Sequence, residues 1–193
     1  MRRWNALLAT VLLVLGICLG MTWQGPARAE AFDDKPVNFV VLDGSRSVTS
    51  PIYRSWYQMV KMNYHFPYHK ISDDNSKALP IVEAMLQHRV DREAMAKAAE
   101  EAGCDVLVVV WVRRMEEEMI QGGWWGNPWN HDTYVRTYAY ADMYAYNKDG
   151  NKFTSKMLRK SDVTDLGNQE HPEITIKWAL GNMLNAMEGR PQI

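Results

Sequence analysis

The feature that most constrains the fold is an unbroken apolar run, VLVVVWV, which follows Asp105 and ends at Val112. A strand with one face in water alternates apolar and polar residues, whereas a run without alternation is typical of a strand covered on both faces. An alanine-rich segment, residues 92–102, precedes this run. Asp91 before it is a typical helix N-cap, and Gly103 after it is a residue type that commonly terminates a helix. We therefore predict a helix that leads through a tight turn into the central strand of a sheet.

A second long segment has a period of two residues, which is typical of a strand with two different faces. Tyrosines dominate one set of alternate positions between Tyr134 and Tyr146, and small or apolar residues occupy the other set between Thr133 and Ala145. We expect the alanine-rich helix to lie on the small-residue face, and the tyrosine face to be partly exposed to solvent. The sequence KDG at residues 148–150 predicts a hairpin turn into a return strand.

The remaining patterns complete the order of elements. A capping serine followed by proline predicts a helix start at Ser50, and Pro172 predicts another. We expect strands over 37–42, 69–72, 105–112, 133–146 and 152–163, and helices that begin near residues 50, 77, 92 and 172. This order predicts an α/β fold with a mixed parallel and antiparallel sheet, helices packed on it, a long C-terminal β-hairpin and a closing helix. We expect a single domain over residues 37–193.

The first 29 residues have the three-part layout of a secretory signal peptide. A basic start at Arg2-Arg3 precedes an apolar run from Ala6 to Leu15, and Ala27-Arg28-Ala29 matches a cleavage site. The apolar run is shorter than the roughly 20 residues that span a bilayer. We expect residues 1–29 to be cleaved after Sec-type export, residues 30–36 to form a flexible tail, and the protein to be periplasmic or extracellular.

Two cysteines bear on the anchoring and the redox chemistry of the chain. LGIC at residues 15–18 is similar to a lipobox, but Ile17 stands where a small residue is normal, and Cys18 lies inside the apolar run rather than at its end. We therefore do not expect a lipoprotein anchor. Only Cys104 remains after cleavage, so no intramolecular disulfide can form. Its position between a helix end and an apolar strand predicts a small buried thiol.

Charge excludes one class of partner. Three of the 22 basic residues lie in the predicted leader, which leaves 19 basic against 23 acidic residues and a net charge of −4. A mildly acidic domain binds polyanions poorly, so we do not expect nucleic acid as a partner. The same acidity argues against binding to anionic membranes.

The most unusual segment is the loop QGGWWGNPWN at residues 121–130, which holds three of the chain's eight tryptophans beside three glycines and a proline. Aromatic side chains clustered at a loop tip are frequent contact points for proteins or membrane interfaces. The alternative is a structural lid over the tyrosine face. We predict a partner-binding surface that joins the loop tryptophans to tyrosines of the neighbouring strand. Its residues are Trp124, Trp125, Trp129, Tyr138, Tyr140 and Tyr144.

No catalytic motif stands out in the chain. Asp43-Gly44-Ser45 follows a strand, but no phosphate-binding or nucleophile pattern continues from it. His65 and His69 have the spacing of metal ligands on a helix, but Pro67 lies between them and breaks that geometry. We therefore predict no enzyme activity, no metal and no cofactor. The acids available to a hydrolase would be Glu117, Glu118 and Asp132.

Three stretches of sequence carry a family resemblance. They are VNFVVLDGS at 37–45, REAMAKAAEEAGCDVLVVVWV at 92–112 and YVRTYAYADMYAYNKDGNKF at 134–153. They resemble the first strand, the helix–strand hallmark and the hairpin of the exported α/β domain shared by the CsgG, LpoB and TolB N-terminal group of bacterial envelope proteins. The resemblance covers most of residues 37–188 and is architectural. It implies a non-catalytic domain that docks on other envelope components, assembles into rings or activates a partner enzyme.

The sequence thus predicts a non-catalytic, exported protein of the bacterial cell envelope that acts as a protein-binding or assembly module. The expected partners are envelope proteins or further copies of the chain, with the Trp/Gly-rich loop as the contact surface. Two alternatives stay open. One is a membrane-surface component that uses the same loop, and the other is a cell-wall glycan-binding or hydrolysing protein, because sugar rings stack on Trp and Tyr side chains. The sequence identifies neither the partner nor the oligomeric state.

Overall fold

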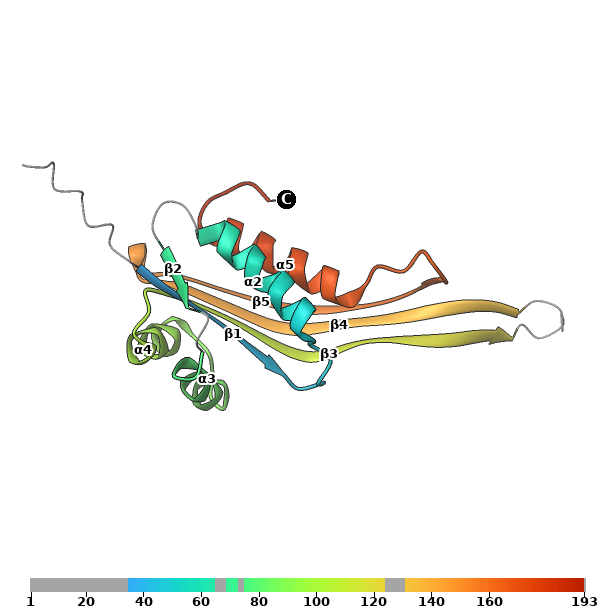
Figure 1. Cartoon of the computed structure of the whole chain (residues 1–193), viewed down its shortest axis with the longest axis horizontal. Helices are drawn as coiled ribbons and strands as arrows, with labels where there is room; N and C mark the ends of the chain where they lie inside the picture. The colour runs from blue at the N-terminus through green and yellow to red at the C-terminus, as the bar shows by residue number, and fades with distance from the viewer. Residues whose placement is uncertain (1–34, 65–68, 73–74, 124–130, 193) are drawn as a thin grey trace, which may run out of the picture. The chain divides into compact units, whose positions relative to one another are not determined.

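Five strands form one mixed sheet in the computed structural model, in the order β2-β1-β3-β4-β5 (Figure 1). The structure describes residues 35–64, 69–72, 75–123 and 131–192. β1 runs parallel to β2 and β3, whereas β3, β4 and β5 form an antiparallel meander. The strands are β1 (Lys35–Asp43), β2 (His69–Ser72), β3 (Val106–Gly123), β4 (His131–Asn147) and β5 (Lys152–Asp165). The predicted α/β fold with a mixed sheet is confirmed.

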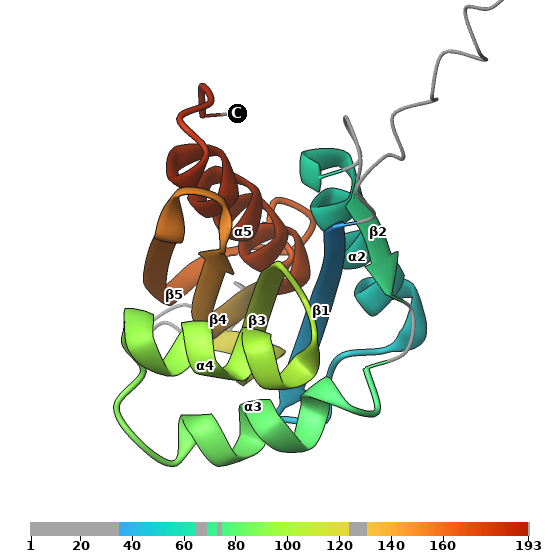
Figure 2. The same ribbon diagram turned by 90° about the vertical axis from the view of Figure 1, so that its left-hand side faces the viewer.

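Four helices cover the two faces of the sheet in pairs, α2 with α5 on one face and α3 with α4 on the other (Figure 2). The predicted end signals of α4 are both present: the Asp91 side chain accepts a hydrogen bond from Ala94 N–H at 3.0 Å, and Gly103 has a φ of 72°. The helices are α2 (Ser50–Tyr64), α3 (Ala78–Leu86), α4 (Arg92–Ala102) and α5 (Pro172–Met187). Within the described ranges, no helix is long and apolar enough to cross a membrane.

β3 is the covered central strand that its apolar run predicts. Val108 and Val110 pack in the core beneath α2 and α5, whereas Leu107 and Val109 pack in the core beneath α3 and α4. All four side chains are fully buried. Burial of a valine or leucine side chain stabilises a fold by roughly 1.5–3 kcal/mol, so this strand contributes strongly to both cores.

The alanine-rich helix does not lie where the sequence predicts. The small-residue face of β4, which includes Ala139 and Ala141, packs with α5, and α4 packs on the opposite face beside Tyr146. The reason is topological. From β1 the chain crosses to β2 in one direction and then returns past β1 to β3 in the other, and right-handed crossovers place the helices of two opposite moves on opposite faces. Connection handedness therefore decides the position of α4, and side-chain size does not.

The β3–β4 hairpin continues well past the four helices (Figure 1). β3 runs to Gly123, beyond its predicted end at Val112, and pairs with β4 until Gly123 lies opposite His131. The register shifts by one residue between Val112 and Arg114, which is the signature of a β-bulge. We call the part of the hairpin beyond this bulge the arm.

Candidate binding surface

One face of the sheet near the root of the arm is lined by tyrosines and arginines. Tyr144 at its inner end packs against the core beneath α3 and α4, and no described helix lies over the remainder (Figure 1). The side chains of this face are exposed or half-buried, apart from one buried aspartate. We call it the tyrosine–arginine face. It consists of Arg113, Arg114, Glu116 and Glu118 of β3, Arg136, Tyr138, Tyr140, Asp142 and Tyr144 of β4, and Arg159 of β5.

Strand register brings these residues together. Arg114 lies opposite Tyr140, and Glu116 lies opposite Tyr138, and directly opposed residues in an antiparallel pair project from the same face. The bulge adds one more residue to this face, because a bulge places two residues of one strand against one residue of its partner. Arg113 occupies that extra position and reaches Asp142 on β4.

A buried carboxylate ties the three strands of this face together. Asp142 is only 4% exposed. Its Oδ2 accepts a hydrogen bond from Arg113 Nε at 2.8 Å, and its Oδ1 accepts one from Arg159 Nη2 at 2.6 Å. Arg113 also stacks on Trp111, with its Cζ 3.0 Å from the ring centroid. Charge-assisted hydrogen bonds of this kind are about twice as strong as neutral ones, so the two guanidinium groups are held in fixed positions.

Contacts with charged side chains also fix the tyrosine rings of this face. Arg114 Cζ lies 3.4 Å from the ring centroid of Tyr138, and the Arg114 guanidinium also pairs with the Glu116 carboxylate. Tyr138 and Tyr140 meet edge to face with ring centroids 6.0 Å apart, and the Tyr138 hydroxyl donates to Glu118 Oε2 at 3.4 Å. Side chains fixed before binding lose less conformational entropy when a partner binds. The face is therefore pre-organised for contact.

The structure places three of the six predicted contact residues on this face. Tyr138, Tyr140 and Tyr144 are half-buried there, and burial raises the pKa of Tyr144, which keeps its hydroxyl neutral. The predicted tryptophans lie outside the described residues, in the segment that links Gly123 to His131 at the end of the arm. Those residues are Trp124, Trp125 and Trp129.

Sequence reasoning missed the arginines. Arg136 was visible as a member of the tyrosine set of alternate positions, and the Arg113-Arg114 doublet directly follows the central strand. Neither signal indicates which side of the sheet the doublet takes, because the bulge that turns both side chains to one face leaves no mark in the sequence.

Two of the acids considered for a hydrolase, Glu117 and Glu118, do not form a pair. Glu117 and Glu118 are neighbours on β3, so their side chains project from opposite faces of the sheet. Glu118 lies beside Tyr138, whereas Glu117 Oε1 lies 2.7 Å from His171 Nδ1 at the start of α5. The side chain of Asp132 lies outside the described residues. Two carboxylates that flank a glycosidic bond must share one face, and these two do not.

Three side chains that could hold a metal ion lie where the arm meets the start of α5. Glu117, His171 and Glu173 each offer one ligand atom, and these atoms lie within 4.8 Å of one another. Glu117 and His171 are exposed. The hydrogen bond from His171 to Glu117, followed by the carboxylate charge, raises the pKa of His171. We interpret the contact as a surface ion pair between the arm and α5.

No family model matches the chain, and no curated protein is significantly similar to it in sequence. Solved structures do align with it. The hypothetical protein CT253 from Chlamydia trachomatis is 7% identical at a TM-score of 0.36, with 81% of this chain and 90% of that chain covered. The PelC dodecamer from Paraburkholderia phytofirmans is 6% identical at a TM-score of 0.39, with 82% and 89% covered. Lipoprotein GNA1162 from Neisseria meningitidis is 12% identical at a TM-score of 0.37, with 80% and 96% covered.

These likenesses are too distant to assign a function, since every identity is below 25% and every TM-score is below 0.5. None of these three structures is described as a member of the CsgG, LpoB or TolB group. That finer assignment stays a prediction from the sequence.

Proposed function

We propose that this protein is an exported, non-catalytic binding module of the bacterial envelope, and that its tyrosine–arginine face contacts a protein partner. The observation that carries the proposal is the cation–π pair of Arg114 and Tyr138 on a part of the sheet that no described helix covers. Tyrosine and arginine are enriched among the residues that dominate binding energy at protein interfaces. A face that holds both in fixed positions suits that role.

The charge of the face favours a protein over a polyanion. Its four arginines stand beside the carboxylates of Glu116, Glu118 and Asp142, and three of the arginines form ion pairs with these carboxylates, so most of the basic charge is paired within the face. Nucleic acids and anionic membranes select surfaces with an excess of basic groups. A mixed pattern of charges instead gives specificity toward a partner with the complementary pattern.

The tryptophan-rich loop is the second part of the proposed contact surface. Residues 124–130 connect the two strands of the arm, so a partner that covers the arm also lies close to Gly123 and His131. We propose that Trp124, Trp125 and Trp129 act as anchors in the same interface. Tryptophan is the residue type with the largest apolar surface to bury.

A crosslinked pull-down from envelope extract tests the proposal. The parent protein is compared with an Arg114→Ser/Tyr138→Ala variant and with a Trp124/Trp125/Trp129→Ala variant. Met119→Ser is the matched control, because Met119 is 76% exposed on the opposite face of β3. We expect a protein that the parent and Met119→Ser capture and that Arg114→Ser/Tyr138→Ala loses.

Each variant is first checked for the parent's circular dichroism and melting temperature. Equal capture by the parent and by Arg114→Ser/Tyr138→Ala would contradict a role for the face. Loss only in the tryptophan variant would move the contact surface to the loop alone.

A further inference from the structure

The sheet has a second feature that the proposed function does not use, an open stretch of edge on β1. β2 pairs only with the first part of β1, from Lys35 to Asn38, whereas β1 continues to Asp43. From Phe39 onward, no strand in the described ranges lies along the outer side of β1. Unpaired edges of this kind are templates for the addition of another strand.

Neighbouring hydrogen bonds show which backbone groups face this edge. Pro36 O accepts from Asp105 N–H at 2.9 Å, and Gly44 N–H donates to Val112 O at 3.0 Å, so the even-numbered residues of β1 turn their backbone groups toward β3. In a parallel strand, alternate residues face alternate sides. The N–H and C=O of Val41 therefore point outward, away from β3.

At the start of the open edge, a side-chain amide donates the hydrogen bond that a neighbouring strand would otherwise donate. The Asn75 side-chain amide donates to Phe39 O and also to the Tyr53 hydroxyl, at 3.1 Å for the second contact. The amide group thus gives Phe39 O the kind of N–H donor that a paired strand would supply. Val41, the next outward-facing residue, lies beyond its reach and lines a groove.

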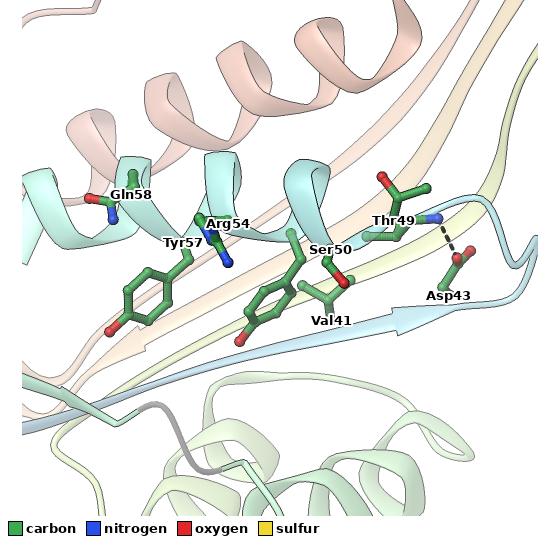
Figure 3. Close-up of a pocket in the computed structure, with 9 residues that line it drawn as sticks. Val41, Asp43, Thr49, Ser50, Arg54, Tyr57 and Gln58 are labelled. Carbon is green, nitrogen blue, oxygen red and sulfur yellow. Dashed lines mark hydrogen bonds between the residues drawn. The ribbon is translucent and has the colours of Figure 1, made fainter.

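The groove runs between this edge and the outer flank of α2, and it has a volume of about 610 Å³ (Figure 3). Tyr57 points from α2 toward β1 (Figure 3). Phe39 stacks on Tyr53 at 5.6 Å, and Tyr53 stacks on Tyr57 at 6.3 Å, so one wall of the groove is a row of aromatic rings. A volume of 300–1,000 Å³ is typical of binding sites.

We propose that an extended peptide segment of a partner protein adds to the Val41 edge as a further strand, with alternate side chains against Tyr53 and Tyr57. An outward N–H and C=O on one residue match the backbone of an extended chain, and a helix beside the edge supplies pockets for its side chains. This site lies at the β1 edge on the side of the sheet that α2 covers, whereas the tyrosine–arginine face lies on the other side of the sheet, and the site does not depend on that face.

The charged side chains beside the groove indicate which charge the peptide carries. The Asp43 carboxylate is already engaged by its own turn, since it accepts from Ser45 N–H at 3.0 Å and from Val48 N–H at 2.6 Å. Arg54 is exposed and lines the groove. The peptide that fits is therefore extended, apolar where it meets the tyrosine rings, and acidic where it passes Arg54.

A library of short random linear peptides displayed on phage supplies the probe. It is selected on protein purified from cells that express the full chain, and an enriched peptide is synthesised. We expect that peptide to bind with micromolar affinity in fluorescence anisotropy and to carry acidic residues. At saturation, we expect exchange of the Val41 amide hydrogen to slow by at least about tenfold.

Two variants make the test specific. Val41→Pro removes the outward N–H and keeps the β1–β3 hydrogen bonds, a position where an edge strand tolerates proline, and we expect it to weaken peptide binding at least about tenfold. Arg54→Glu is expected to weaken binding about fivefold or more, whereas Lys61→Glu, exposed on the same helix and not among the residues that line the groove, leaves it unchanged.

Either of two results would overturn the inference. One is a selection that enriches no peptide. The other is a peptide that binds while Val41 exchange stays the same, which the parent protein alone reveals even if Val41→Pro fails to fold. Protection of Val41 that rises with protein concentration and without peptide would assign the edge to a second copy and would also contradict the proposal. None of these results bears on capture through the tyrosine–arginine face.

Discussion

Arg113 donates from Nε to Oδ2 of Asp142 at 2.8 Å across the β3–β4 pair, at the bulge where the arm begins. The contact joins a residue that the bulge adds to the face with a carboxylate that is almost fully buried. It therefore fixes the root of the arm and the position of the rings beside it.

Replacement of Asp142 by Asn is expected to destabilise the fold by about 2 kcal/mol. The variant removes the charge that two guanidinium groups share, and hydrogen bonds to charged groups contribute about 1.5–3 kcal/mol. The partial exposure of both arginines keeps the loss below that of a fully buried ion pair. Equilibrium urea denaturation measures the free energy of unfolding.

Asp165→Asn at the exposed end of β5 is the matched control and should change the free energy of unfolding by less than about 0.5 kcal/mol. If the two variants were equally stable, the carboxylate of Asp142 would have no structural role.

Helix packing gives a second prediction, at Gly181 in the middle of α5. A Cβ added there would lie 3.0 Å from Met59 Sδ of α2, so the glycine allows the two helices to approach closely. We expect Gly181→Val to destabilise the protein by about 1–3 kcal/mol through overpacking. Ala186→Val, at an exposed position of the same helix, should cost only about 0.5 kcal/mol.

A double-mutant cycle with Met59→Ala checks the cause of this loss. The Gly181→Val/Met59→Ala protein should be more stable than the sum of the two single losses predicts, because the Met59 side chain is the group displaced. Strict additivity measured by urea denaturation would exclude this contact as the cause.

The ion pair between the arm and α5 predicts a pH dependence. The hydrogen bond that His171 donates to Glu117, and then the charge of the Glu117 carboxylate, raise the pKa of His171 above the ordinary value of 6.5. The folded state therefore binds this proton more tightly than the unfolded state. The resulting stabilisation is fully present below about pH 6.5 and is lost as the pH rises through the folded-state pKa.

An NMR titration of His171 in the parent and in Glu117→Gln measures this effect. We expect the pKa of His171 to fall in the variant, and the stability difference between the two proteins, well under about 1 kcal/mol for exposed groups, to vanish at alkaline pH. An unchanged pKa in Glu117→Gln would show that the pair does not form in solution.

Burial predicts an inert thiol at Cys104. Desolvation raises its pKa to about 12, and its Sγ donates to Ala99 O at 3.6 Å. Because the thiolate is the reactive form, iodoacetamide at pH 8 should leave native Cys104 unmodified while free glutathione reacts completely. In concentrated urea the same residue should react fully. Mass spectrometry of the peptide that contains Cys104 reports both results, and rapid native modification would contradict the predicted burial.

Much of the fold was predictable because local chemistry and tertiary structure agree. The apolar run up to Val112 needs two covered faces, and the structure provides them. Asp91 and Gly103 end α4 where their capping chemistry predicts, and Gly150 adopts a φ of 73° in the turn after β4. In each case a few neighbouring residues contain the whole signal.

The unpredicted features depend on residues far apart in the chain. The charged part of β3 has no clear alternation, and it becomes a strand because β4 pairs with it. The contacts of Asp142 join three strands, and the side taken by α4 follows from the crossover connections. None of these has a local signature.

Site-specific photocrosslinking in living cells tests directly whether the tyrosine–arginine face contacts a partner protein. p-Benzoylphenylalanine is placed at Glu118, on the tyrosine–arginine face, or at Met119, the next residue on the opposite face; both positions are exposed. We predict a discrete crosslinked product, with the mass of one partner protein added, from position 118 and none from position 119. Equal products from the two positions, or a product only from 119, would contradict the assignment of the tyrosine–arginine face as the contact surface.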